Sequence, residues 1–206
     1  MRPAPGPAVR LKRLLLLACV LLPLLAGCDR TQDASQYALT NITGSSFGKE
    51  LNLTDHNGKK RSLEDFRGKV VAVFFGFTHC PDACPTTLAE LAQVMRELGP
   101  DADKVQVLFV TVDPERDTPP VLAQYVSSFN PSFLGLWGDA EATARAAKEF
   151  KVFFQKQPTQ GGGYSVDHSA GTYLFDRNGR LRLFASFGQD GTALLHDVRL
   201  LLAEKQ

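Results

Sequence analysis

Apolar side chains in this sequence alternate between continuous runs and helical spacings. Residues 69–77 (Lys-Val-Val-Ala-Val-Phe-Phe-Gly-Phe) and residues 105–112 (Val-Gln-Val-Leu-Phe-Val-Thr-Val) are almost uninterrupted β-branched and aromatic runs. Such runs predict strands that are buried on both faces of a sheet. In residues 81–98 the apolar positions recur every three or four residues, and Gly99-Pro100 follows them. That spacing predicts a helix between the two strands.

The remainder of the chain continues this alternation. Its pattern predicts three further helices and four short strands, the helices at residues 117–129, 140–150 and 190–205 and the strands at residues 134–137, 152–154, 172–175 and 181–185. Asp117 or Thr118 is expected to cap the first of these helices. Asn-Gly pairs at residues 57–58 and 178–179 predict β-hairpins. Together these elements predict a mixed central sheet with flanking helices. The pattern resembles a thioredoxin-like α/β fold with an added N-terminal β-hairpin.

The first 27 residues have a different composition. Basic side chains at residues 2–13 are followed by an apolar run at residues 14–26, which contains Pro23. A helix of that length covers about 20 Å, whereas the hydrocarbon core of a bilayer is roughly 30 Å thick. The run therefore predicts a cleaved signal peptide over residues 1–27, and an uncleaved membrane anchor is the alternative.

The predicted cleavage point carries a lipoprotein pattern. Leu25-Ala-Gly-Cys28 resembles the lipobox of bacterial lipoproteins, in which the cysteine receives lipid and becomes the new N-terminus. Asp29 resembles the signal that retains such proteins in the inner membrane. We therefore expect Cys28 to be a lipid anchor and residues 28–46 to be a flexible tether, with a short strand near its end. The folded domain is expected at residues 47–206, facing the periplasm from the bacterial inner (cytoplasmic) membrane.

The charge balance argues against nucleic acid as a partner. The whole chain has 23 basic and 22 acidic residues, and four of the basic residues lie in the predicted signal peptide. Removing them leaves 19 basic against 22 acidic residues, a net charge of −3. A weakly acidic domain has no electrostatic footprint for a phosphate backbone.

Only two cysteines remain as candidate thiols, since Cys19 lies in the predicted signal peptide and Cys28 would carry lipid. Cys80 and Cys84 stand at the start of the first predicted helix, where a spacing of four puts both side chains on one face. The helix dipole there favours thiolates. Two thiolates suit Cu(I), and an added imidazole could accommodate Cu(II) or Zn(II).

The same pair could also form a disulfide. A bridge that closes a five-residue loop constrains the unfolded chain little, so a purely stabilising disulfide is the weaker interpretation. A redox role remains open, in which the pair cycles between dithiol and disulfide.

Three segments carry a resemblance to a known family. Residues 76–85 (Gly-Phe-Thr-His-Cys-Pro-Asp-Ala-Cys-Pro), residues 111–119 (Thr-Val-Asp-Pro-Glu-Arg-Asp-Thr-Pro) and Val166-Asp-His168 resemble the Sco/SenC family of copper-binding thioredoxin-fold proteins. The resemblance implies that Cys80, Cys84 and His168 bind copper, as Cu(I), Cu(II) or both. It further implies a membrane-tethered copper chaperone that helps to build the CuA centre of cytochrome c oxidase.

The resemblance also suggests partners and an alternative activity. The expected partner is the CuA-bearing subunit II of the oxidase, and a second periplasmic copper chaperone or a thiol reductant are further candidates. The alternative is a thiol-disulfide oxidoreductase that keeps the copper-ligand cysteines of that subunit reduced, with Cys80 and Cys84 as its catalytic pair. Oxidoreductases of this fold carry a cis-proline where this chain has Ala170, a difference that favours copper binding. A peroxidase-like role is the weaker interpretation, because the sequence shows no convincing Thr/Cys/Arg arrangement for binding peroxide.

Other polar residues near these motifs have predicted supporting roles. His79, Asp82 and Asp167 are candidates for orienting the metal ligands. His168 follows the Gly161-Gly-Gly163 segment, so we expect it to swing onto a metal that the thiolates hold.

Two further expectations concern residues outside the ligand motifs. Asp113 and Arg116 are expected to pair and fix the loop that follows the second strand. His56 and His196 are expected to be solvated.

Overall fold

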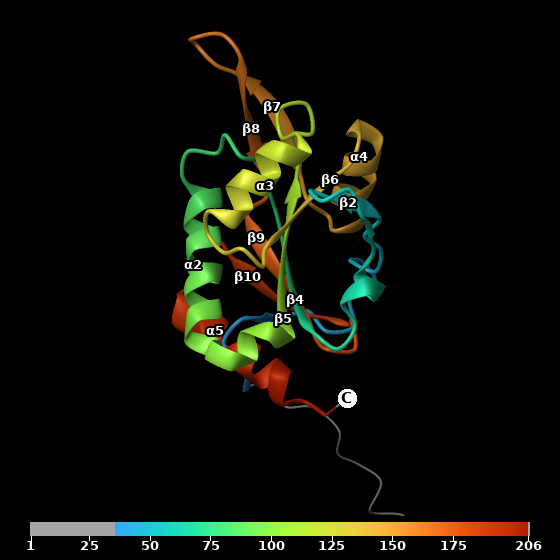
Figure 1. Ribbon diagram of the computed structural model, residues 1–206, viewed down its shortest axis with the longest axis vertical. Coiled ribbons are helices and arrows are strands. Elements are labelled where there is room, and N and C mark those ends of the chain that lie inside the picture. Colours follow the sequence, from blue (N-terminus) through green and yellow to red (C-terminus); the bar gives the residue numbers. More distant parts are fainter. Residues whose placement is uncertain (1–35, 206) are drawn as a thin grey trace, which may run out of the picture. The chain divides into compact units, whose positions relative to one another are not determined.

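The structure, a computed structural model, describes residues 36–205 (Figure 1). The predicted signal peptide, Cys19, Cys28 and residues 29–35 of the predicted tether lie outside the described residues. Eight strands form one mixed sheet, in the order β1-β10-β9-β4-β5-β6-β2-β3. These strands are β1 (Thr40–Asn41), β2 (Leu53–Asp55), β3 (Lys60–Arg61), β4 (Val70–Gly76), β5 (Val105–Thr111), β6 (Leu134–Trp137), β9 (Gly171–Phe175) and β10 (Leu181–Ser186).

The centre of the sheet agrees with the sequence pattern. Strands β4, β5 and β6 run parallel, and β9 adds antiparallel to β4. Every residue of β4 and β5 is buried, as their continuous apolar runs predicted. Both Asn-Gly turns connect antiparallel strands, β2 to β3 and β9 to β10.

Helices cover both faces of the sheet, which confirms the predicted α/β architecture. They are α2 (Ala83–Leu98), α3 (Pro119–Ser127), α4 (Ala140–Glu149) and α5 (Gly191–Ala203), together with 3₁₀ turns at Leu63–Phe66 and Gly99–Lys104. Helix α5 packs beside α2 (Figure 1). Phe74 and Phe75 point to opposite faces of β4, because successive side chains alternate along a strand.

Contacts between aromatic rings show on which face of the sheet α3 and the end of α4 lie. Phe74 packs on Phe109, whose ring in turn contacts Tyr125 of α3. On the other face, Phe75 contacts Phe150, the residue that follows α4. Within the described part of the chain, no helix has the length and apolar character needed to span a bilayer.

One hairpin differs from the expected pattern. The sequence predicted a strand at residues 152–154 followed by a glycine-rich loop, whereas the structure has β7 (Phe154–Pro158) paired antiparallel with β8 (Tyr164–His168). The two form a separate two-stranded sheet. Most of their residues are exposed or half-buried, with Val166 the buried exception. His168 is therefore the last residue of a strand and not part of a loose loop.

The packed domain includes residues that the sequence indicated as tether. Tyr37 and Leu39 are buried, and β1 pairs with β10. The backbone N–H groups of Ala38 and Leu39 donate to the buried carboxylate of Asp197 on α5, at 3.0 and 2.8 Å. The expected short strand near the end of the tether is present as β1, and the packing begins about ten residues before the expected boundary at residue 47.

A buried arginine ties the two ends of the described chain together. Arg182 on β10 is 1% exposed and donates from Nη1 to Asp176 at 3.1 Å and to Glu204 at 2.5 Å. Its Nη2 donates to the hydroxyl of Tyr37 at 2.9 Å. Burial opposes ionisation of Asp176, but the Arg180 backbone N–H and the two guanidinium groups outweigh it and lower the pKa of that carboxyl.

Candidate metal centre

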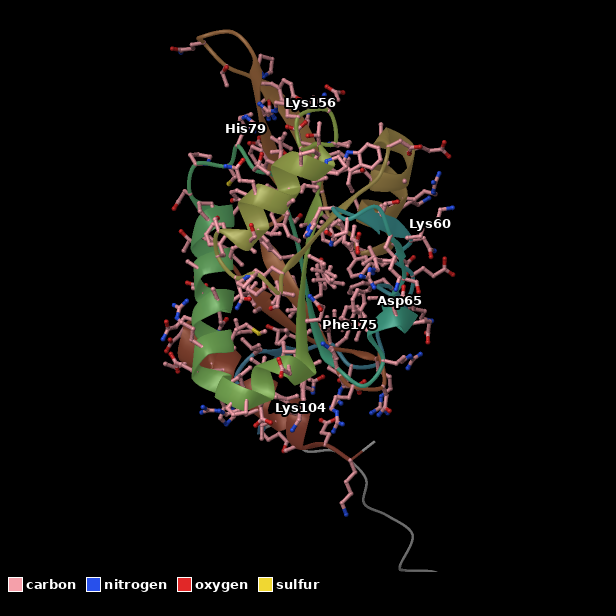
Figure 2. All side chains as sticks on the ribbon, in the orientation of Figure 1. Lys60, Asp65, His79, Lys104, Lys156 and Phe175 are labelled. Carbon is pink, nitrogen blue, oxygen red and sulfur yellow. The ribbon has the colours of Figure 1, made fainter. Side chains whose placement is uncertain are left out.

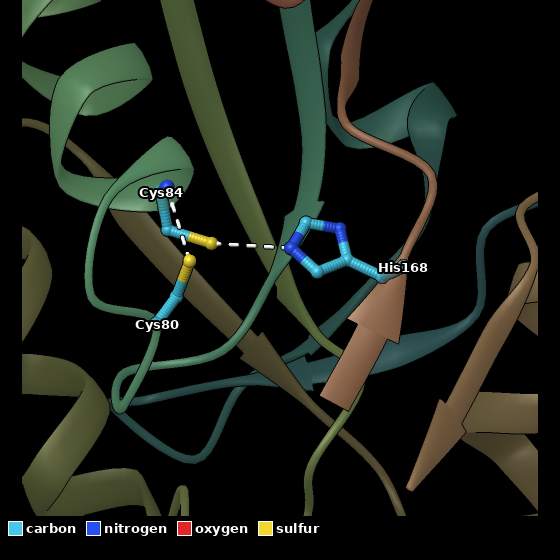
Figure 3. A group of neighbouring side chains, drawn as sticks. All are labelled: Cys80, Cys84 and His168. Carbon is cyan, nitrogen blue, oxygen red and sulfur yellow. Dashed lines mark hydrogen bonds between the residues drawn. The ribbon is translucent and has the colours of Figure 1, made fainter. Parts of the chain in front are cut away.

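Three side chains from distant segments converge at one end of the sheet. Cys80 lies in the loop after β4, Cys84 in the first turn of α2, and His168 at the end of β8 (Figure 3). One ligand atom from each lies within 4.8 Å of the other two. The Cys84 Sγ is 3.4 Å from the His168 Nε2, and the backbone N–H of Cys84 points to the Cys80 Sγ at 3.4 Å. The structure thus brings together the three residues expected to bind copper.

The sulfur of Cys84 fits against the sheet because β4 ends in a glycine. Cys84 is fully buried, whereas Cys80 and His168 are half-buried. A Cβ atom at Gly76 would lie 2.7 Å from the Cys84 Sγ and 2.9 Å from the Phe109 Cε2, closer than real Cβ contacts allow. A side chain at this position would displace the sulfur. Because Cys80 and His168 are only half-buried, the site is open to solvent on their side.

The imidazole of His168 presents one particular nitrogen to the sulfurs. Its Nδ1 is 3.1 Å from the carbonyl oxygen of Ser169. Because a carbonyl can only accept, Nδ1 carries the proton and Nε2 is left with a free lone pair facing Cys84. The ring packs edge-on against Phe77 and Phe74, with centroids 5.7 and 6.3 Å apart. These contacts hold the ring in the orientation that a metal ligand needs.

The two thiols have opposite acidities. The hydrogen bond from Cys84 lowers the pKa of Cys80 to about 5, against the effect of burial, and backbone N–H groups of Cys84 and Asp82 add to the lowering. The same interaction with Cys80, together with burial, raises the pKa of Cys84. The first proton therefore leaves Cys80, and the resulting thiolate is stabilised by its neighbour's S–H.

This asymmetry predicts how the reduced protein without metal reacts with iodoacetamide. Only thiolate reacts, so alkylation of Cys80 should proceed at a nearly constant rate from about pH 6 to 8 and fall to half near pH 5. An unperturbed thiol would instead slow about tenfold for each pH unit below its ordinary value near 8.5. Mass spectrometry of the modified peptides at each pH measures the two sites separately.

The matched control is the Cys84→Ala variant, which lacks the donor that stabilises the Cys80 thiolate. Its alkylation profile should shift to higher pH, because the largest contribution to the lowered pKa is lost. A wild-type profile with its midpoint above about pH 8 would contradict the predicted thiolate.

The expected supporting residues have different positions. Asp82 and Asp167 are exposed, and among the described residues no hydrogen bond links either carboxylate to the three candidate ligands. Asp82 acts on Cys80 through its backbone N–H instead. The side chain of His79 is 56% exposed, and its Nδ1 lies 3.1 Å from the Thr78 hydroxyl. The expectation that these residues orient the ligands stays a prediction.

The buried carboxylate of Asp117, for which the sequence predicted a helix cap, instead supports the loop that carries Cys80. Asp117 accepts hydrogen bonds from the backbone N–H and the hydroxyl of Thr78, at 3.0 and 2.6 Å, and from the hydroxyl of Thr111 at 2.6 Å. Thr118 holds the N-cap position of α3 without a capping side-chain bond. Asp117 therefore joins the end of β5 to the loop that carries Cys80, a role that no local sequence signal indicated.

The loop between β5 and α3 contains the predicted ion pair. Arg116 pairs through Nε with the buried carboxylate of Asp113, which confirms that prediction. The hydroxyl of Tyr164, the first residue of β8, donates to the same carboxylate at 2.7 Å. The loop is thus bound to the hairpin that ends in His168.

The two remaining histidines have different environments. His56, expected to be solvated, is half-buried, and its Nδ1 accepts from the backbone N–H of Gly135 at 3.0 Å. That expectation was wrong, because the β2–β3 turn packs against β6. His196 is exposed as expected and lies 2.7 Å from Asp197.

Comparison with known proteins gives matches to SCO proteins. The SCO1/SenC family model matches residues 40–203. The mitochondrial SCO2 homologue of Mus musculus is 36% identical over 184 residues, which is 87% of this chain and 72% of the mouse protein. The mitochondrial SCO2 homologue of Homo sapiens is 44% identical over 133 residues, which is 63% of this chain and 50% of the human protein.

A solved structure agrees with these matches. Bradyrhizobium japonicum ScoI, determined with copper bound, is 42% identical and superposes with a TM-score of 0.70 over 76% of this chain and 100% of its own. The family match covers most of the packed domain, including all three converging side chains and the strands and helix that carry them. The chain therefore belongs to the SCO1/SenC family.

Proposed function

We propose that this protein binds copper through Cys80, Cys84 and His168 and delivers it during assembly of the CuA centre of cytochrome c oxidase. The observation that carries the proposal is the convergence of two sulfurs and one imidazole nitrogen within 4.8 Å in a member of the SCO1/SenC family. Copper bound to the Bradyrhizobium relative supports the choice of metal.

The donor set suits copper on chemical grounds. Thiolates are soft ligands that favour Cu(I), and an imidazole adds a donor that Cu(II) also accepts. Cys80 supplies a thiolate near neutral pH, since its pKa is about 5, and the proton of Cys84 leaves when the metal binds. Two sulfurs suffice for Cu(I), whereas Cu(II) gains more from the nitrogen of His168.

The exposure of the ligands suits delivery by ligand exchange. Cys80 and His168 are half-buried and reachable from solvent, while Cys84 is buried against the sheet. Ligands of an acceptor can therefore replace Cys80 and His168 first, and Cys84 last.

We infer that the acceptor is the CuA-bearing subunit II. We further infer that a lipid on Cys28 holds the domain at the periplasmic face of the inner membrane.

Copper titration of His168→Ala tests the three-ligand site. Wild-type protein should bind one equivalent of copper, and its Cu(II) form should show a thiolate-to-copper charge-transfer band. The variant should keep Cu(I) binding through its two sulfurs but lose or strongly shift that band. His196→Ala is the matched control, because His196 is an exposed histidine on α5 and should bind copper as the wild type does.

Two results would overturn the proposal. One is a wild-type protein that binds no copper when reduced under anaerobic conditions. The other is a His168→Ala variant whose Cu(II) spectrum equals that of the wild type, since His168 would then contribute no ligand.

The acidities of the two thiols favour a second candidate function, thiol-disulfide exchange with the acceptor's copper-ligand cysteines. The Cys80 thiolate would attack a disulfide of the acceptor and release one of its thiolates. Cys84, after losing its proton, would attack the Cys80 sulfur and release the second thiolate, so that two electrons pass to the acceptor. This activity should survive in His168→Ala and vanish in Cys80→Ala, whereas delivery of Cu(II) from the three-ligand site should fail in both.

A further inference from the structure

Arg116 connects the loop after β5 with the hairpin that carries His168. Its Nη1 donates to the backbone carbonyl of Tyr164 at 2.8 Å. Its guanidinium lies over the Tyr164 ring, 3.9 Å from the centroid, while its Nε pairs with Asp113. The Tyr164 hydroxyl also donates to Asp113. The first residue of β8 is therefore held at its carbonyl, its ring and its hydroxyl.

A second route leads from Arg116 to the imidazole itself. The guanidinium lies 5.9 Å from the centroid of the Phe77 ring, which is buried and stands edge-on to His168. Phe77 therefore separates the arginine from the histidine and contacts both. The other route runs along the five residues of β8 from Tyr164 to His168.

The burial of these groups argues against a role in stability alone. Asp113 is fully buried, and the Nη2 of Arg116 is buried without a hydrogen-bond partner among the described residues. An unpaired buried donor is unfavourable, so the arrangement is not the most stable one that these residues could form. An arginine with one unpaired buried nitrogen is explained if its position serves the neighbouring site.

We propose that Arg116, together with Asp113 and Tyr164, is a positioning residue that holds His168 within ligand distance of the sulfurs before copper binds. The proposal rests on the proposed function and names the residues that prepare its third ligand. The hairpin clamp would maintain the distance of 3.4 Å that separates the His168 Nε2 from the Cys84 Sγ. We call Asp113, Arg116 and Tyr164 the hairpin clamp.

Two conservative variants loosen the hairpin clamp in different ways. Arg116→Lys keeps the positive charge but loses the planar fork that serves Asp113 and the Tyr164 carbonyl together. Tyr164→Phe keeps the ring beneath the guanidinium and removes only the hydroxyl bond to Asp113. Gln160→Ala is the matched control, since Gln160 is exposed in the turn that connects β7 and β8. Lys156, labelled in Figure 2, would not serve, because its Nζ lies 4.5 Å from the centroid of the Tyr164 ring.

The first measurement follows His168 in the reduced protein without copper. Imidazole NMR signals of the wild type and of Gln160→Ala should be sharp, with one ring environment. Arg116→Lys should broaden or shift them, and Tyr164→Phe should do so to a smaller extent. Because no copper is present, this result does not depend on whether copper delivery is the protein's function.

The second measurement is copper binding by the same variants. Loss of an outer contact to a metal ligand typically weakens binding by about 10–100-fold, and we expect that loss for Cu(II) in Arg116→Lys. Cu(I) affinity should change less, because both sulfurs remain. Thermal unfolding of the metal-free variants verifies that they fold. If Arg116→Lys does not fold, the His168 signals and the Cu(II) affinity of Tyr164→Phe test the proposal. Unchanged His168 signals together with a wild-type Cu(II) spectrum in both variants would overturn the proposal.

Discussion

The Cys80→Ala/Cys84→Ala variant should take up no copper at concentrations that saturate the wild type. Removing both sulfurs leaves one imidazole, and a single borderline donor cannot hold Cu(I) against a competing chelator. The loss should be complete in anaerobic Cu(I) titrations and in the metal content of the purified protein. It is the largest functional effect that we expect from any substitution in this chain.

A neighbouring substitution shows whether the loss is specific. Thr86 is exposed in the same turn of α2, two residues after the buried Cys84, so Thr86→Ala should bind copper normally. Circular dichroism and thermal unfolding should show that the double variant keeps its fold, apart from a modest loss for the missing buried sulfur. Equal copper stoichiometry in the double variant and the wild type would disprove the metal site.

Arg182→Met should cause the largest loss of stability. Arg182 is buried with the carboxylates of Asp176 and Glu204, and removing one partner of a buried ion pair costs about 3–5 kcal/mol. Denaturant unfolding of the metal-free protein measures the change in the free energy of unfolding. The loss should also reach the N-terminal segment, because Arg182 holds the hydroxyl of Tyr37.

Arg180→Met is a close control for this effect. Arg180 pairs with the same carboxylate of Asp176 at 2.7 Å, but its side chain is 61% exposed. An exposed pair contributes up to about 1 kcal/mol, so this variant should unfold nearly as the wild type does. Equal losses in the two variants would show that burial of Arg182 is not what matters.

The effect of Arg182→Met should depend on pH. The pKa of Asp176 is lowered in the folded protein, so its ionised form stabilises the fold at neutral pH. This contribution is present above the ordinary carboxyl pKa and is lost as the pH falls through the lowered value. The difference in stability between the wild type and Arg182→Met should therefore shrink in acid.

The sequence predicted the parts of the fold that local patterns determine. Two buried strands with a helix between them follow from apolar runs and spacing, and both Asn-Gly turns form hairpins. The cysteine pair could be placed at a helix start because the helical spacing of apolar residues begins beside it. These features depend on neighbours within a few positions, which a single sequence reveals.

The rest of the site depends on contacts between distant segments. His168 lies 84 residues from Cys84, and only the family resemblance linked them in advance. Strand β7 was misplaced because its exposed faces carry polar side chains, such as Gln155 and Lys156, without an apolar alternation. Asp117 appeared to be a helix cap by position, yet its partners Thr78 and Thr111 come from other elements.

The edge strands of the main sheet affect whether copies of this protein can associate through their strands at high concentration. Its two edge strands, β1 and β3, have two residues each. A short edge exposes few unpaired backbone groups, and β3 consists of Lys60 and Arg61, whose charges repel the same strand of another copy. The eight-stranded sheet therefore resists growth by strand addition, which protects concentrated protein from aggregation through sheet edges.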